Sequence, residues 1–193
     1  MWFRQIMFFT FGMLFRVKKT KNKKLFESIW HEVWADEGYQ ETPEEMAKYD
    51  PYSTDFILFF WFKPCGTLRI VHDSATGLPI FNDFPVVHRL WQTNNIKEIT
   101  LLTVKKTFRK THLSHLPLFI LIRHLARLSR KNSIEGWVMM ADRRLFFLLR
   151  RKKVPIYQIG QERFYKGSIT YPAYIPTQEF LTKMEKINPF LTL

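Results

Sequence analysis

The sequence predicts a single α/β domain in which helices cover both faces of one mixed sheet. Strand-like and helix-like stretches alternate along the 193 residues in the order β-α-β-β-β-α-β-α-β-β. A chain of this length can bury a full core but is short for two ordinary domains, so we expect one domain over 1–193. Hydrophobic residues make up 46% of the chain, with only seven Gly and ten Pro, which argues against disorder.

Three helices can be placed with their ends. Apolar residues recur at helical spacing over 23–36, and Gly38 should end that helix because glycine readily takes the left-handed conformation. Pro117 suits the first turn of an amphipathic helix over 116–128. Asp142 can cap a further helix that runs to residue 149.

The remaining elements are strands and one last helix. Two β-rich runs flank the turn 63–66, which reads as a hairpin. The stretches 39–55 and 73–95 are rich in turn residues and read as loops. Strands are expected over 13–20, 56–62, 67–72, 96–105, 136–141 and 154–160, another strand near Thr170, and a helix over 177–187.

The charge of the chain predicts an acidic partner. Lys and Arg number 30 against 17 Asp and Glu, a net charge of +13, and the basic residues gather in runs such as 105–110 and 143–153. Nucleic acid, an anionic membrane face and an acidic carrier protein would all fit. We do not expect nucleic acid, because no zinc-finger spacing, RNP-type strand or GxxG clamp accompanies the charge.

The first 17 residues are apolar, but Arg4, Gln5 and Arg16 interrupt them. The segment is too short to span a bilayer and lacks the pattern of a signal peptide. An interfacial membrane anchor and a buried first element both remain open. The lone Cys65 cannot form an internal disulfide, so a cytoplasmic location, possibly at the inner membrane face, is the expectation.

Several catalytic classes have no support in the sequence. The six His residues form no set with metal-ligand spacing, so no metal site is expected. Cys65 has no His close to it in the sequence, and the G-x-S-x-G signature of serine hydrolases is absent.

Four short motifs stand in order along the chain. The first is the helix and its exit, LFESIWHEVWADEGY, where Trp34, Glu37, Gly38 and Tyr39 follow an aromatic-acid-glycine-aromatic pattern. The others are Tyr49-Asp50, the stretch GTLR that ends at Arg69, and the stretch EITLLTVKKTFRK that begins at Glu98.

Over about 13–160 these motifs resemble the acyl-homoserine-lactone synthases, exosortase-associated acyltransferases and N-acyl amino acid synthases of the GNAT superfamily. The resemblance implies a GNAT-like three-layer domain, with a central mixed, mostly antiparallel twisted sheet. It also implies an N-acyltransferase.

The departures from the family pattern bear on the substrates. Trp30 stands where the family usually has Arg, Ala47 replaces an acid and Leu101 replaces another Arg. Two of these losses remove contacts that lactone synthases use around S-adenosylmethionine, so homoserine lactone is not the expected product. The glycine-rich acetyl-CoA loop is missing over 105–111, which favours acyl carrier protein over free acetyl-CoA.

The resemblance therefore implies transfer of a long-chain fatty acyl group from acyl carrier protein, or acyl-CoA, to the amine of an amino acid or similar small amine. Such a site must deprotonate an ammonium, hold the reactants in line and stabilise an oxyanion. Glu98 would be the general base, unless it is a surface carboxylate paired with Lys97 or Lys105. Asp50 and Glu37 could orient the amine, and Arg69 could pair with Asp50 or bind a substrate carboxylate.

The resemblance also suggests the remaining contacts of the two substrates. Trp34 and Tyr39 join Glu37 as acceptor-binding residues, and Arg109 and Lys110 are candidates for the pantetheine phosphate. The fifth strand of this fold splays from the fourth and opens the pantetheine cleft. Its expected lining is Leu102, Thr103, Val104, Trp137, Met139 and Met140, although core packing is the alternative for the last three.

Acyl-phosphopantetheine is a donor and no permanent cofactor is expected. The alternative function is a non-catalytic basic module that binds nucleic acid or an anionic membrane.

Overall fold

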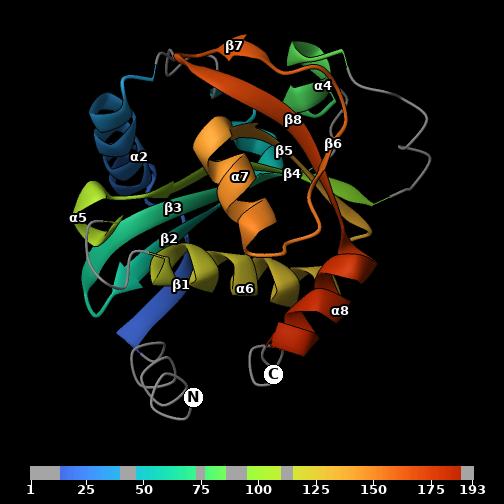
Figure 1. Ribbon diagram of the computed structural model, residues 1–193. Helices are drawn as coiled ribbons and strands as arrows, with labels where there is room; N and C mark the ends of the chain where they lie inside the picture. Colours follow the sequence, from blue (N-terminus) through green and yellow to red (C-terminus); the bar gives the residue numbers. More distant parts are fainter. Residues whose placement is uncertain (1–13, 40–46, 73–76, 86–94, 110–114, 188–193) are drawn as a thin grey trace.

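The computed structural model describes residues 14–39, 47–72, 77–85, 95–109 and 115–187 (Figure 1). The strands are β1 (Phe15–Thr20), β2 (Ser53–Phe60), β3 (Lys63–Val71), β4 (Ile96–Val104), β5 (Gly136–Asp142), β6 (Tyr157–Gln158), β7 (Arg163–Tyr165) and β8 (Ser168–Pro176). The helices are α2 (Lys23–Glu37), the 3-10 turn η1 (Asp50–Tyr52), α4 (Pro79–Asp83), α5 (Lys106–Arg109), α6 (Leu116–Lys131), α7 (Arg143–Arg151) and α8 (Thr177–Ile187).

One sheet holds all of these strands. Its order is β1-β2-β3-β4-β5-β8-β6, with β7 paired to β8. The β4–β5 pair is parallel, and the other pairs are antiparallel. The mixed, mostly antiparallel sheet confirms the predicted fold class.

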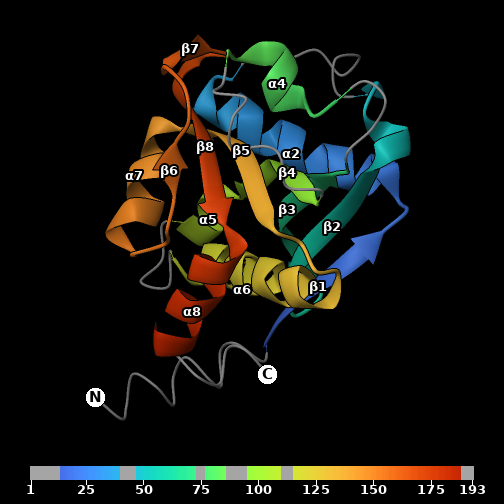
Figure 2. The ribbon, with the colours of Figure 1, turned by 90° about the vertical axis from the view of Figure 1, so that its right-hand side faces the viewer.

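Helices cover both faces of the sheet (Figure 2). On one face, α6, α7 and α8 share a core with strand residues such as Leu68 and Trp137. On the other face, α2 packs against Ile57 and Leu101, and α4 lies over Val138. Because neighbouring strand residues point to opposite faces, Trp137 and Val138 fall in different clusters.

The sequence signals for α2 act as expected. The Asn22 side chain accepts a hydrogen bond from the Leu25 N–H at 3.0 Å and caps the helix start. Gly38 ends the helix in the left-handed conformation, with φ of 72°. The last turn of α2 is therefore held at a defined place beside the sheet.

The hairpin of β2 and β3 turns earlier than predicted. Lys63 already pairs with Phe60, so Trp61 and Phe62 form the turn and the predicted turn 63–66 lies within β3. Gly66 is needed there for a different reason: a Cβ atom on it would approach the Thr103 carbonyl oxygen to 2.4 Å. The glycine permits close packing of β3 on β4.

Other differences lie in segments read as loops or as longer strands. The elements η1, α4 and α5 occur in stretches without a clear helical spacing of apolar residues, and β7 is not among the predicted strands. The strand expected over 154–160 is reduced to Tyr157–Gln158. Of the apolar N-terminal segment, residues 1–13 lie outside the described residues, while Phe15 is buried in the main core. Among the described residues no helix is both long and apolar enough to cross a membrane.

Candidate active site

A cleft opens where β4 and β5 part. The two strands pair only from Ile96 opposite Gly136 to Ile99 opposite Met139. Beyond this point β4 follows β3 to Val104, while β5 follows β8. The last five residues of β4 therefore have no backbone pairing with β5, and a cavity of about 440 Å³ lies there.

A bulge in β4 shapes the cleft. Thr67 pairs with Thr103 but Arg69 pairs with Thr100, so β4 has an extra residue. Leu101, at this point, has a left-handed φ of 47°, and its carbonyl accepts a hydrogen bond from the Thr67 hydroxyl at 2.9 Å. The bulge thus lies beside the cavity, and Leu101 is one of the residues that line it.

The lining of the cavity comes from both faces of the sheet. Apolar side chains from the α6–α7 face line it at Leu118, Leu145 and Leu148. From the opposite face come the C-terminal turn of α2, the segment before β2 and α4. The polar lining residues include Trp34, Glu37, Tyr39, Lys48, Tyr49, Asp83, Thr100, Asp142, Tyr165, Lys166, Ser168 and Thr170.

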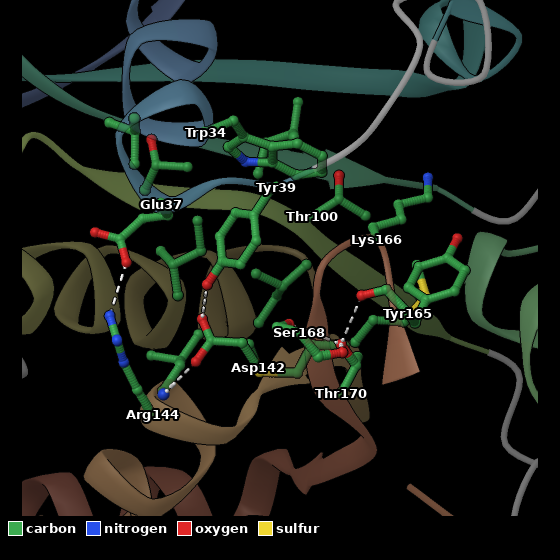
Figure 3. Close-up of a pocket in the computed structure, with 18 of the residues that line it drawn as sticks. Trp34, Glu37, Tyr39, Thr100, Asp142, Arg144, Tyr165, Lys166, Ser168 and Thr170 are labelled. Carbon is green, nitrogen blue, oxygen red and sulfur yellow. Dashed lines mark hydrogen bonds and ion pairs between the residues drawn. The ribbon is translucent and has the colours of Figure 1, made fainter. Parts of the chain in front are cut away.

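Glu37 links three elements at one side of the cavity. One of its oxygens lies 2.7 Å from the Arg109 guanidinium. The other lies 2.8 Å from that of Arg144 (Figure 3). Both arginines line the cavity as well. The two basic runs noted in the sequence thus meet at Glu37, while Lys110 lies outside the described residues.

Tyr39 and Asp142, which both line the cavity, point toward each other (Figure 3). The Tyr39 hydroxyl donates to Asp142 Oδ2 at 2.9 Å, and Asp142 Oδ1 accepts from the Leu145 N–H at the start of α7. Burial and the nearby Asp142 carboxylate raise the pKa of Tyr39 well above its ordinary value, so its hydroxyl remains a donor. This bridge fixes α7 relative to the exit of α2.

Glu98 is fully buried beneath α4. Its Oε2 accepts a hydrogen bond from the Ile80 N–H at 2.8 Å, while Oε1 has no partner among the described residues. Burial raises the pKa of Glu98 well above its ordinary value, and Asp83 adds to the effect. Glu98 is not among the residues that line the cavity, but Thr100 is. Thr100 follows Glu98 by two residues on the same face of β4, and its hydroxyl also has no partner in the described part of the chain.

The surface alternative for Glu98 is wrong. Its side chain has no exposed area, and Lys105 pairs with Glu32 at 2.6 Å instead. The carboxylate lies under α4 because even-numbered residues of this part of β4 face that helix.

Arg69 and Asp50 form an ion-pair network away from the cavity. Arg69 makes a bidentate contact with Asp55 at 2.7 and 2.9 Å and lies 3.0 Å from Asp50, which also pairs with Lys23. The Arg69 guanidinium stands over the ring of Phe26 on α2. Neither Arg69 nor Asp50 lines the cavity, so of the two predicted roles for Arg69 the structure shows the ion pair.

The expected donor side needs one correction. Leu102, Thr103, Val104, Met139 and Met140 line the cavity, but Trp137 does not. The Trp137 indole N–H donates to the Ser129 hydroxyl at 2.8 Å, and the ring is fully buried in the core with α6. Trp137 also lies at the level where β4 and β5 are still paired, so the cleft has not yet opened there.

Sequence reasoning missed the part of the site formed by α4 and the β7–β8 hairpin. The Tyr165 hydroxyl donates to Asp83 Oδ2 at 2.6 Å, and Lys166 follows in the turn. The sequence does carry a signal for this hairpin, because Lys166-Gly167 separates two β-rich runs. The structure has positive φ at both residues, 49° and 95°, as in a two-residue hairpin turn.

No group of three or more His, Cys, Asp or Glu residues in the described part could hold a metal ion. Cys65 is buried, and burial raises the pKa of its thiol to about 12. A thiol with such a pKa stays protonated and is a poor nucleophile.

Comparison with known proteins gives the family. The model of the family described as N-acyl amino acid synthase FeeM matches residues 27–176. Comparison with curated proteins finds none that matches.

Solved structures share the fold at low sequence identity. The structure of FeeM, an N-acyl amino acid synthase from uncultured soil microbes, has a TM-score of 0.71 at 16% identity, over 86% of this chain and 92% of that one. The acyl-homoserine-lactone synthase LasI has a TM-score of 0.66 at 15% identity, over 84% and 89% of the two chains. The CoA-dependent acyl-homoserine lactone synthase BjaI, solved with SAM and isopentyl-CoA, has a TM-score of 0.65 at 12% identity, over 90% and 88%. On the family match, the chain belongs to the FeeM family of N-acyl amino acid synthases and is a GNAT-type acyltransferase.

Proposed function

We propose that this acyltransferase moves a long-chain fatty acyl group from the phosphopantetheine thioester of acyl carrier protein to the amine of an amino acid or a similar small amine. The observation that carries the proposal is the cavity between β4 and β5, with apolar residues from α6 and α7 on one face of the sheet and ionisable residues on the other. In the reaction the amine attacks the thioester carbonyl, a C–N bond forms, and the C–S bond breaks to release the thiol.

The free edge of β4 can receive the pantetheine arm. Its backbone groups between Thr100 and Val104 have no pairing with β5, and pantetheine is an extended chain that carries two amides. An extended amide chain can pair with such an edge as an added strand does. This would bring the thioester to the bulge at Leu101, a residue that lines the cavity.

The apolar wall suits the acyl group. Leu102, Leu118, Leu145, Leu148 and Met139 contribute side chains to one continuous cavity. Its volume of about 440 Å³ falls within the roughly 300–1,000 Å³ of ordinary ligand pockets. Burial of each methylene contributes about 0.8 kcal/mol, so such a wall would favour a long chain over acetyl.

The opposite part of the lining is complementary to an amino acid. The Asp83 carboxylate can attract an ammonium group, while Lys48 and Lys166 can attract a carboxylate. Tyr165 holds Asp83 through its hydroxyl. A zwitterionic amino acid could pair its ammonium with Asp83 and its carboxylate with the lysines, whereas a simple alkylamine could pair only with Asp83.

Glu98 is the proposed general base and would act through a relay. Oε1 of Glu98, which has no partner among the described residues, and the hydroxyl of Thr100 lie on one face of β4, and of the two residues only Thr100 lines the cavity. A water between them could pass the ammonium proton to Glu98. The raised pKa of Glu98 brings its basicity closer to that needed near neutral pH.

Acyl carrier protein as donor is supported by charge. Arg109 and Arg144 line the cavity, and α7 continues the basic surface with Arg143, Arg150 and Arg151 exposed. Carrier proteins are acidic, and complementary charge speeds encounter. Family membership favours the enzyme over the non-catalytic basic module.

The test uses purified protein with long-chain acyl carrier protein and pooled amino acids. Free carrier thiol should appear, and mass spectrometry of lipid extracts from expressing cells should reveal an N-acylated product. Glu98→Gln should slow thiol release by on the order of a hundredfold or more, because glutamine can still accept from Ile80 but cannot take a proton. Glu135→Gln, an exposed acid just before β5, is the matched control and should retain full rate. Full activity in Glu98→Gln would remove Glu98 from the mechanism, and no thiol release with any amine would reject the proposed reaction.

A further inference from the structure

Two large aromatic side chains stand exposed at the turn of the β2–β3 hairpin. Trp61 is 60% exposed and Phe62 is 89% exposed. Trp61 also has a φ of 55°, a left-handed conformation that Gly, Asn or Asp usually fills in a tight hairpin turn. Neither core packing nor turn geometry accounts for tryptophan and phenylalanine at these two positions.

The strand segments that carry and flank the turn are basic and contain no acid. Lys63 follows Phe62 and is exposed, and the exposed Arg16 on β1 pairs with Phe59. Neither β1 nor the stretch 57–66 contains Asp or Glu. The turn therefore combines exposed aromatic rings with positive charge.

The N-terminal end of β1 lies at the same place. The Trp61 N–H donates to the Leu14 carbonyl at 2.7 Å, and Phe15 pairs with Phe60. The sequence that precedes Leu14, MWFRQIMFFTFGM, is rich in aromatic residues and carries one charge, Arg4. The chain thus enters the described fold directly beside the exposed turn.

We propose that the β2–β3 turn, Trp61 and Phe62 with Lys63 and Arg16, is a contact surface for an anionic lipid bilayer. Tryptophan favours the headgroup level of a membrane, phenylalanine the hydrocarbon below it, and Lys and Arg are attracted to anionic headgroups. The net charge of +13 favours the same partner. This inference does not rest on the proposed reaction.

A protein partner suits the turn less well than a bilayer. The two rings together offer on the order of 300–400 Å² of surface, whereas a stable protein interface buries about 800 Å² on each partner. The turn is also a protruding tip, and a bilayer needs no matching pocket to accept it. A second copy of the chain is therefore the alternative that the experiment must exclude.

The experiment measures co-sedimentation with phosphatidylcholine–phosphatidylglycerol vesicles and with phosphatidylcholine alone. Phe62→Ser should lower the partition coefficient for the anionic vesicles about tenfold, because one ring no longer enters the bilayer. Lys63→Gln should lower it about fivefold, and only on the anionic vesicles. Phe164→Ser on β7 is the matched control, since Phe164 is 74% exposed and lies at a distant edge of the fold (Figure 1).

Each other outcome overturns the proposal. Wild-type binding by Phe62→Ser, or an equal loss in Phe164→Ser, would mean that the turn is not the contact. Equal binding of the wild type to both vesicle types would mean that Lys63 and Arg16 do not attract anionic headgroups, which contradicts the proposed contact. If the wild type does not bind vesicles but forms a dimer that Phe62→Ser dissociates, the turn contacts a second copy instead. Phe62 is exposed, so the melting temperature of Phe62→Ser should equal that of the wild type and exclude misfolding as the cause.

Discussion

Replacing Arg69 by methionine tests whether this residue stabilises the fold or binds substrate. The Arg69 side chain is only 3% exposed, and it is shared between Asp55 and Asp50. Removal of one partner from a buried ion pair costs about 3–5 kcal/mol, because the remaining charge is left uncompensated. For a chain of this size each kcal/mol lowers the melting temperature by about 2–4 °C, so Arg69→Met should melt on the order of 10 °C lower.

Calorimetry and the thiol-release assay, run well below the melting temperature, separate the two roles. Arg69→Met should keep its kcat/KM within about threefold, because Arg69 does not line the cavity. Arg16→Met, an exposed arginine on β1, is the control and should change stability by less than about 0.5 kcal/mol. Adding Asp55→Asn to Arg69→Met should recover part of the loss, since it removes one unpaired carboxylate. An unchanged melting temperature with a large loss of kcat/KM would refute the structural role and assign Arg69 to substrate binding.

Two further predictions concern α7 and Glu98. Reversal of Arg150, Arg151 and Lys152 to Glu should reduce turnover sharply with carrier-bound acyl groups but spare a small acyl-pantetheine donor, which needs no docking surface; equal losses with both donors would reject a docking role. Because the pKa of Glu98 is higher in the folded protein than in the unfolded chain, the carboxyl ionises at lower pH in the unfolded chain. The free energy of unfolding therefore has its full Glu98 contribution below about pH 4.3 and loses it as pH rises toward the folded-state pKa. The free energy of unfolding, measured in urea, should therefore rise for Glu98→Gln relative to the wild type by up to about 1.4 kcal/mol per pH unit above pH 4.3. If the two proteins show the same pH dependence of that free energy, the carboxyl of Glu98 is not buried as described.

Local signals in the sequence predicted the elements whose ends are set locally. The Asp142 side chain caps α7, and the last helix runs over Thr177–Ile187 as expected. The hairpin turn was misplaced because Pro64 and Gly66 are ordinary turn residues, whereas Trp61 and Phe62 are not. Gly66 is required by its contact with the Thr103 carbonyl, which lies 37 positions away and leaves no local signal.

Site residues could be predicted where they belong to one motif on one element. They could not be predicted where the site forms between elements that are far apart in the sequence. Trp34, Glu37 and Tyr39 come from the end of α2, and all three line the cavity. Asp83 and Tyr165 meet only because β7 and β8 fold back over α4, 82 positions along the chain. Trp137 lies on the expected strand, but at a level where β4 and β5 are still paired, and its indole packs in the core against α6.

Glu98 shows why residue type and position are not sufficient to describe a base. Its place on β4 follows from the sequence, but its environment depends on α4, which supplies the Ile80 N–H and covers the carboxyl. Oε1 of this buried carboxylate has no partner in the described part of the chain, which is unfavourable for folding, and leucine or methionine would fill a purely packing position at less cost. The same burial raises the pKa toward the range in which a carboxylate can accept a proton from an ammonium group. The instability at this position and its proposed chemistry therefore have one physical cause, and Glu98→Gln should gain stability at neutral pH while it loses activity.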